Sequence, residues 1–145
     1  MRTIAALFDF DGVIMDTEAQ YTLFWNEQGS VYLGENNFGY GIKGQTLTQI
    51  YNKYFLGKEA IQQEITDKLD EFEKHMYYEY IPGVKDFIID MKRNCAKIAI
   101  VTSSNEKKMK NVYHAHPELK ELVDCILTSE MFIKSKPSPD CFLAA

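Results

Sequence analysis

Apolar residues along the chain follow two different periods, and the alternation between them predicts an α/β fold. Residues 3–8, 97–102 and 123–128 are short, nearly continuous apolar runs, which are typical of strands buried on both faces of a parallel sheet. Between these runs, from residue 84 and again from residue 109, apolar residues recur every three or four positions, the period of an amphipathic helix. Strand, helix, strand, helix and strand with short connections predict right-handed crossovers and helices on both faces of the sheet.

Residues 18–80 follow a different pattern, with no convincing strand. Two helical stripes of apolar residues lie in this segment, one around Ile50 and a longer one around Ile65. A helical block therefore interrupts the α/β pattern after the first strand. We predict a discontinuous core formed by residues 1–17 and 81–145, with residues 18–80 as an inserted α-helical lid.

Composition narrows the class of protein. The 145 residues are 46% hydrophobic and 26% charged, with a net charge of −5, which suits one globular domain or a small core with an insert. No basic stripe is interleaved with aromatic residues, so we expect no nucleic-acid partner. We also expect no membrane association, because no segment approaches the roughly 18 consecutive apolar residues of a membrane span. The N-terminus runs directly into the first apolar run, without the features of a secretory signal.

The cysteines and a lysine-rich segment have ordinary interpretations. Cys95, Cys125 and Cys141 match neither a zinc pattern nor a disulfide framework. We therefore predict reduced thiols packed in the core of a cytoplasmic protein. The segment Lys107–Lys110 contains three lysines, which predict a solvated helix face.

Two carboxylates, Asp9 and Asp11, directly follow the first apolar run, and Gly12 allows a tight turn away from the sheet. Residues i and i+2 point to the same side of an extended chain, so we expect both carboxylates on one side of the loop. Charges at the end of a buried strand need a partner, and a divalent cation is the obvious one. The pair suits a nucleophile and a general acid/base. A carboxylate that attacks phosphorus needs its repulsion with the phosphate offset, as Mg²⁺ does. The alternative is a strand-end turn in which the carboxylates only cap the backbone.

Polar segments also follow the second and third apolar runs. Thr102 and Ser103 supply a hydroxyl and successive backbone N–H groups just before Asn105, a candidate N-cap, and such an arrangement can bind an anion. Lys136 lies in the proline-stiffened turn Ser135–Asp140, which can hold a positive charge against a phosphate. Taken singly, the first segment could equally be an ordinary helix cap. The second could equally be a turn with a surface lysine. Their shared location with the carboxylates, at the carboxyl edge of one sheet, favours a single ligand site.

The residues above carry a family resemblance. The chain resembles the haloacid dehalogenase superfamily and, within it, the β-phosphoglucomutase-like phosphatases. The run Asp9–Ile14 is similar to the family's first motif, Thr102 to its second, and Lys136 in Ser-Lys-Pro-Ser-Pro-Asp to its third. The helical block resembles the family's α-helical cap. The resemblance covers essentially the whole chain and implies a Rossmann-like parallel-sheet core with that cap inserted.

The resemblance implies a role for each matching residue. Asp9 would be the nucleophile that becomes an aspartyl-phosphate, and Asp11 would protonate the leaving oxygen and later activate water. The carboxylate of Asp9 and the backbone carbonyl of Asp11 would bind Mg²⁺. Thr102 and the backbone N–H of Ser103 would hold the phosphoryl oxygens. Lys136 would pair with Asp9 and with the phosphate.

The chain also departs from the family pattern. Lys43 and Gly44 resemble a substrate-specificity loop of the cap, for which the alternative is a glycine turn with an exposed lysine. Tyr21 and Leu47 stand where the mutases carry a histidine and a phosphate-binding arginine, so the resemblance favours a phosphatase over a mutase. The family's fourth motif, an acidic pair that completes the magnesium shell, does not occur before Ala145. We therefore expect a C-terminally incomplete core, from a longer or clipped gene product, and poor magnesium binding by this polypeptide.

We predict a magnesium-dependent phosphatase that hydrolyses a small phosphorylated metabolite, similar to a sugar phosphate, through an aspartyl-phosphate. One alternative is a β-phosphoglucomutase-like sugar phosphomutase. Another, from a different class, is an inactive truncated fragment or binding module that keeps the fold but not the metal site. A dehalogenase is less consistent with the sequence, because that chemistry does not need Asp11. The motifs give the class of reaction and leave the substrate and the oligomeric state open.

Overall fold

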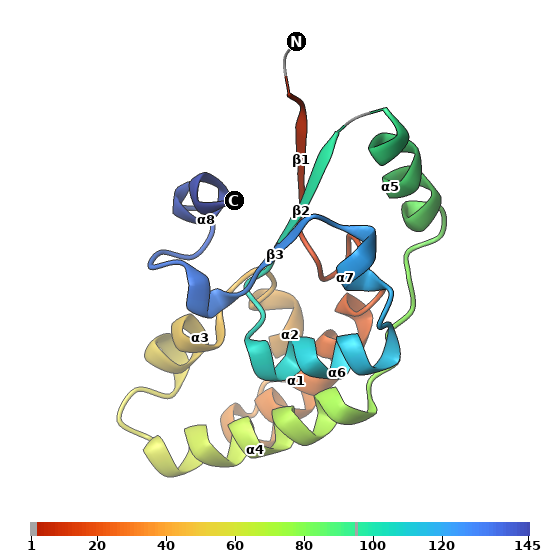
Figure 1. The fold of residues 1–145 in the computed structure, drawn as a ribbon. Coiled ribbons are helices and arrows are strands. Elements are labelled where there is room, and N and C mark those ends of the chain that lie inside the picture. The colour runs from red at the N-terminus through yellow and green to blue at the C-terminus, as the bar shows by residue number, and fades with distance from the viewer. Residues whose placement is uncertain (1–2, 95) are drawn as a thin grey trace. The chain divides into compact units, whose positions relative to one another are not determined.

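The computed structural model describes residues 3–94 and 96–145. The chain forms two compact units, one made of residues 3–17 with Tyr77–Ala145 and the other of Glu18–Met76. Figure 1 labels the elements of both. Among the helices of the described ranges, none combines the length and the apolar character needed to cross a membrane.

A parallel three-stranded sheet forms the centre of the first unit. Its strands are β1 (Ala5–Phe8), β2 (Lys97–Val101) and β3 (Cys125–Leu127), in the order β1-β2-β3. The predicted α/β class and the three predicted strands are confirmed. Each strand is one to three residues shorter than its apolar run, since strand pairing stops before the apolar residues do.

Helices connect the strands in chain order. α5 (Val84–Arg93) precedes β2, and α6 (Glu106–Ala115) and α7 (Leu119–Leu122) lie between β2 and β3. The 3-10 turn η1 (Ser129–Met131) and the short helix α8 (Asp140–Ala144) follow β3. This order supplies the helical crossovers that join parallel strands.

Local signals set the starts of two of these helices. α5 begins after Gly83, whose φ of 84° lies in the left-handed region that glycine adopts freely. α6 has its predicted N-cap, because Asn105 Oδ1 accepts a hydrogen bond from the backbone N–H of Lys108 at 2.8 Å. The cap places the first turn of α6 directly after the end of β2.

Burial differs among the three strands. The side chains of β2 from Ile98 to Val101 are buried, as the apolar runs predict. Leu7 of β1 is 40% exposed, so the prediction of burial on both faces is wrong for this strand. Cys125 of β3 is an exposed thiol, which corrects the prediction of a core position, whereas Cys141 is a buried free thiol. β1 and β3 are the edges of the three-stranded sheet, where a strand has one paired neighbour. Cys95 lies outside the described residues.

Two segments connect the units, one on each side of the second unit in the sequence. They are hydrogen-bonded to each other through residues of the first unit. Tyr80 forms an antiparallel bridge with Met15, and the backbone N–H of Asp16 donates to the carbonyl of Glu79 at 2.8 Å. The loop that follows β1 is therefore tied to the segment that re-enters the first unit.

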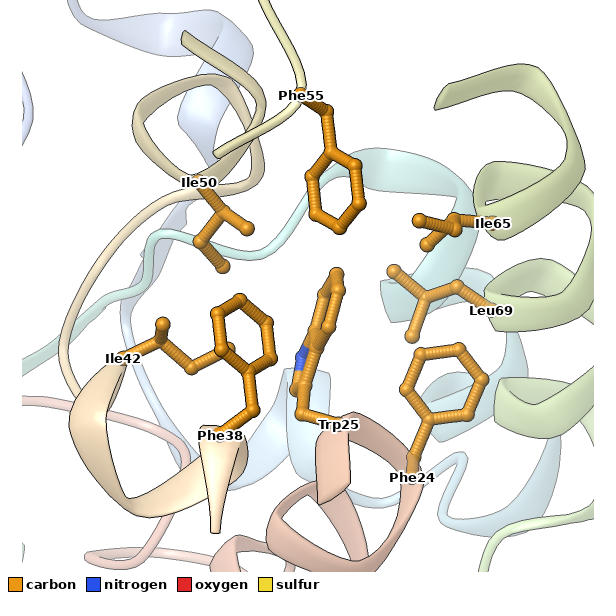
Figure 2. Packing of buried hydrophobic residues seen from close by; sticks show 8 residues of the cluster. All are labelled: Phe24, Trp25, Phe38, Ile42, Ile50, Phe55, Ile65 and Leu69. Carbon is orange, nitrogen blue, oxygen red and sulfur yellow. The ribbon is translucent and has the colours of Figure 1, made fainter. Parts of the chain in front are cut away.

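The second unit is described throughout, and its regular elements are helical: α1 (Glu18–Leu33), α2 (Phe38–Gly41), α3 (Leu47–Tyr54) and α4 (Glu59–His75). Figure 2 shows how aromatic rings from α1 and α2 face aliphatic side chains from α3 and α4 in one buried cluster. Its buried members are Phe24, Trp25, Phe38, Ile42, Ile50, Phe55, Ile65 and Leu69.

Candidate active site

The carboxyl ends of β1 and β2 meet at one edge of the sheet, and the first loop of the site begins there. Phe8 of β1 pairs with Ile100 of β2, so Asp9 follows β1 beside the end of β2. Phe10 is fully buried, and its carbonyl accepts a hydrogen bond from the backbone N–H of Ile14 at 2.9 Å. A buried ring between the two carboxylates thus anchors the loop that carries them.

Asp9 and Lys136 form an ion pair at this edge. The Lys136 ammonium lies 2.8 Å from Asp9 Oδ1 and donates to the carbonyl of Val101 at 3.0 Å. The backbone N–H of Phe10 also donates to Asp9 Oδ1, at 2.7 Å. Both contacts fall on Oδ1, and the Asp9 side chain is 50% exposed. The Oδ2 atom therefore remains accessible beside a positive charge that β2 holds in place.

Asp11 has a more enclosed environment. Its Oδ1 accepts hydrogen bonds from the Thr17 hydroxyl at 2.6 Å and from the Lys108 ammonium at 2.5 Å. Its Oδ2 accepts one from the Ser104 hydroxyl at 3.0 Å. The side chain of Asp11 is 27% exposed, whereas that of Lys108 is only 3% exposed. The second carboxylate thus has its own lysine, distinct from the one that pairs with the first.

Opposing effects act on the pKa of Asp11. Burial raises it, because a desolvated carboxylate is costly. The charge of Lys108 and the hydrogen bonds from Lys108, Thr17 and Ser104 lower it, and the net result is a pKa below the ordinary value for aspartate. In the absence of substrate, this arrangement therefore favours the carboxylate form of Asp11.

Lys108 corrects the prediction that the lysines of Lys107–Lys110 share a solvated face. Its two lysine neighbours in the segment are exposed, but Lys108 itself is buried. It occupies the same face of α6 as Met109 and Val112, which are fully buried. The sequence contained this signal, since position 108 belongs to the apolar stripe of the helix. The position of Lys108 on the stripe indicates burial, whereas the charge of a lysine favours exposure to solvent.

Thr102 lies buried at the end of β2. Its Oγ1 accepts a hydrogen bond from the backbone N–H of Ser104 at 3.0 Å, and its own N–H donates to the carbonyl of Leu127 at 2.9 Å. Ser103, between them, is exposed. These contacts fix the segment that was predicted to hold an anion. The side chain from this segment that contacts Asp11 is Ser104, which sequence reasoning did not single out, just as it did not single out Thr17.

Lys43 and Gly44 lie in the second unit, between α2 and α3. The Lys43 ammonium is 4.0 Å from a carboxylate oxygen of Glu18 and 5.5 Å from the centre of the Tyr40 ring, with the side chain 48% exposed. Gly44 adopts a φ of 79°, and no heavy atom lies within 4 Å of the place that a Cβ would take. The local structure is a glycine turn beside an exposed lysine, and the role in substrate choice stays a prediction.

Whether the described residues fit a magnesium ion depends on the chemistry of their oxygen donors. Asp9 offers an accessible carboxylate oxygen, and Mg²⁺ commonly binds one or two carboxylates while it keeps several waters. The Asp11 carboxylate already accepts three hydrogen bonds, which is compatible with the role for its backbone carbonyl that the family resemblance implies. Within residues 3–94 and 96–145, no three His, Cys, Asp or Glu side chains gather as a metal site. The donor set therefore fits a magnesium ion that also binds water and substrate oxygens.

Comparison with known proteins identifies the family. A family described as haloacid dehalogenase-like hydrolase matches residues 6–145, so the chain belongs to it. A candidate pyrophosphatase, PpaX, of Caldanaerobacter subterraneus is 28% identical over 100% of this chain and 67% of its own length. A phosphorylated carbohydrates phosphatase of Thermotoga maritima is 24% identical over 96% of this chain and 67% of its own.

Solved structures share the fold. The β-phosphoglucomutase of Clostridium difficile superimposes with a TM-score of 0.76 at 21% identity, over 99% of this chain and 69% of that chain. A family IA hydrolase of Entamoeba histolytica gives a TM-score of 0.79 at 19% identity over the same shares. The predicted membership of this superfamily is confirmed. The chain spans about two thirds of the length of its curated relatives.

Proposed function

From membership of this hydrolase family, we propose that the chain is a magnesium-dependent phosphatase that hydrolyses a small phosphorylated metabolite, similar to a sugar phosphate. The observation that carries the proposal is the ion pair of Asp9 and Lys136, in which a half-exposed carboxylate lies 2.8 Å from a fixed positive charge. The two curated relatives carry names that describe the hydrolysis of phosphate bonds, which supports this class of reaction. We propose a cytoplasmic location, in keeping with the free thiols of Cys125 and Cys141.

In the first step, a carboxylate oxygen of Asp9 attacks phosphorus, and the bond between phosphorus and the ester oxygen breaks. Asp11, a carboxylate in the free chain, takes up a proton from solvent as the substrate binds and gives it to the leaving oxygen, so that the products are an alcohol and an aspartyl-phosphate on Asp9. Lys136 keeps its charge beside the attacking carboxylate and the phosphoryl oxygens throughout. The Asp9 carboxylate and the Asp11 carbonyl would hold magnesium, whose charge would offset the repulsion between the carboxylate and the phosphate.

In the second step, water attacks the phosphorus of the aspartyl-phosphate. Asp11 accepts a proton from this water, and the bond between phosphorus and the Asp9 oxygen breaks. Inorganic phosphate leaves, Asp9 returns to its carboxylate form, and Asp11 regains the proton that it gave in the first step. The Thr102 hydroxyl and the backbone N–H of Ser103 hold the phosphoryl oxygens in both steps.

Two residues of the second unit support a phosphatase over a mutase. Leu47 packs against the buried apolar cluster, and the Tyr21 hydroxyl donates to a carboxylate oxygen of Glu73 at 2.8 Å. Neither provides the cationic clamp that a second phosphate needs. Hydrolysis requires a single phosphate site. We propose that the second unit serves as a cap and that Lys43 and Gly44 contribute to its choice of substrate.

Phosphate release by the purified chain tests the proposal. Because weak magnesium binding is expected, the chain should release phosphate from p-nitrophenyl phosphate at saturating Mg²⁺ and stop when EDTA removes the metal. Asp9→Asn should abolish turnover, because an amide oxygen does not displace an ester oxygen from phosphorus. Asp90→Asn, which changes an exposed aspartate of α5, is the matched control and should keep full activity. Turnover that persists in EDTA, or in Asp9→Asn, would contradict the mechanism.

A further inference from the structure

The two oxygens of the Asp11 carboxylate are not equivalent. A carboxylate oxygen can accept about two hydrogen bonds in the plane of the group. Oδ1 accepts two, from Thr17 and Lys108, and Oδ2 accepts one, from Ser104. Oδ1 is therefore saturated, and Oδ2 keeps one position at which a proton can bind.

Lys108 also fixes the direction of the Ser104 hydroxyl. The Lys108 ammonium donates to Ser104 Oγ at 2.9 Å as well as to Asp11 Oδ1. Because Ser104 Oγ accepts from Lys108, its own hydrogen is directed to Asp11 Oδ2, 3.0 Å away. One buried ammonium thus contacts one carboxylate oxygen directly and the other through a hydroxyl.

We infer that Lys108 is a positioning residue for Asp11: it anchors Oδ1 so that Oδ2 is the atom that exchanges a proton with the leaving group and then with water. This inference rests on the proposed function, because it assigns an atom to the acid/base step of that reaction. Lys108 does not act as a phosphate-binding residue, since its side chain is 3% exposed and its ammonium faces Asp11 and Ser104.

Positioning and phosphate binding give different kinetic results. Lys108→Met keeps most of the length of the side chain and removes its charge, so Asp11 Oδ1 keeps only the Thr17 hydroxyl. We expect kcat for an alkyl phosphate to fall by about 10- to 100-fold, part of the roughly 10²–10⁴-fold that a placed acid/base contributes. The KM, and the inhibition constant of inorganic phosphate, should stay within about two-fold of the unchanged chain. Lys110→Met, on the exposed face of the same helix, is the control and should match the unchanged chain.

The leaving group provides a second readout that a purely structural role would not change. A nitrophenolate leaves without a proton, whereas an alkoxide needs one. Lys108→Met should therefore lose more activity on the alkyl phosphate than on p-nitrophenyl phosphate. Equal losses on both substrates, or a rise in KM together with the inhibition constant of phosphate, would overturn the inference. Thr17→Val removes the other Oδ1 donor without removing a charge, and it should give the same preference with a smaller loss.

Thermal unfolding separates this inference from the proposed function. If the unchanged chain has no magnesium-dependent activity, the proposed function fails, and with it the acid/base role of Oδ2. The contact itself is then decided by a double-mutant cycle. Lys108→Met should lower the unfolding midpoint by about 10 °C, because it leaves a partly buried carboxylate without its cation. In an Asp11→Asn background, Lys108→Met should lower the unfolding midpoint by at least about 5 °C less than it does in the unchanged chain. Additive losses would show that Lys108 does not act on Asp11.

Discussion

Replacing Gly39 with alanine tests whether the second unit depends on a close approach of α1 and α2. A Cβ at Gly39 would lie 2.4 Å from the carbonyl oxygen of Thr22 and 3.0 Å from Asn26 Oδ1. The Thr22 oxygen belongs to the backbone of α1 and cannot rotate away, so α2 must shift by about 1 Å to restore an ordinary contact. The hydrogen bond from the Gly39 N–H to Asn26 Oδ1, 2.8 Å long, lies at the same place and would weaken.

The structure sets the size of the effect. Overpacking of this kind costs about 1–3 kcal/mol, and a weakened hydrogen bond adds up to about 1 kcal/mol. Alanine recovers roughly 0.5–1 kcal/mol through the lower entropy of the unfolded chain. We therefore expect Gly39→Ala to lower the free energy of unfolding by about 2 kcal/mol. Gly41→Ala is the matched control in the same helix: no heavy atom lies within 4 Å of its Cβ position, so it should be neutral or slightly stabilising.

Urea unfolding followed by tryptophan fluorescence measures this difference. The chain has one tryptophan, Trp25, which is 7% exposed in the apolar cluster of the second unit. Its emission therefore reports the unfolding of the unit that contains Gly39. Equal midpoints for Gly39→Ala and Gly41→Ala would refute the close contact of α1 and α2.

Two further predictions concern the candidate site. Lys136→Met should lower kcat/KM for p-nitrophenyl phosphate by about 10²-fold or more, because a fixed charge at the reacting group is lost, while the exposed Lys134→Met serves as a control. Lys136→Met should change the free energy of unfolding in urea by less than about 1 kcal/mol, since the Asp9 partner of Lys136 is 50% exposed. Asp11, whose pKa is lowered in the folded chain, contributes stability that is present above the ordinary carboxyl pKa of about 3.9 and is lost as pH falls through the folded value. Urea midpoints measured between pH 5 and pH 2 should therefore fall less steeply for Asp11→Asn than for the unchanged chain, and parallel curves would contradict the shift.

Much of the fold could be predicted from the period of apolar residues. The runs that became β1, β2 and β3 are too short and too continuous for amphipathic helices, and the stripes that became α5 and α6 follow the helical period. The exposure of Leu7 could not be predicted in the same way. An apolar run indicates a strand that tends to be buried, but its place at the edge or the centre of a sheet is decided by pairing with distant segments.

The candidate site, like the fold, could be predicted from the sequence only in part. Asp9, Thr102 and Lys136 could be placed together because each follows a strand, and the carboxyl ends of parallel strands share one edge. That rule uses chain order alone. It does not say which donors contact which carboxylate, and it gave no indication that Asp9 and Asp11 would face different lysines.

Lys108 shows why the rest needs the folded chain. A lysine on an apolar stripe is costly to bury alone, so assigning it to the solvent is the better choice when no partner is known. The partner is Asp11, almost a hundred positions earlier in the sequence, and it is equally costly to enclose without a cation. Each burial is reasonable only because of the other, and local periodicity contains no information about such a pair. A buried ion pair is weak evidence for stability. Because one member of this pair is the carboxylate proposed to exchange protons, Lys108 points to a use in the reaction rather than in folding.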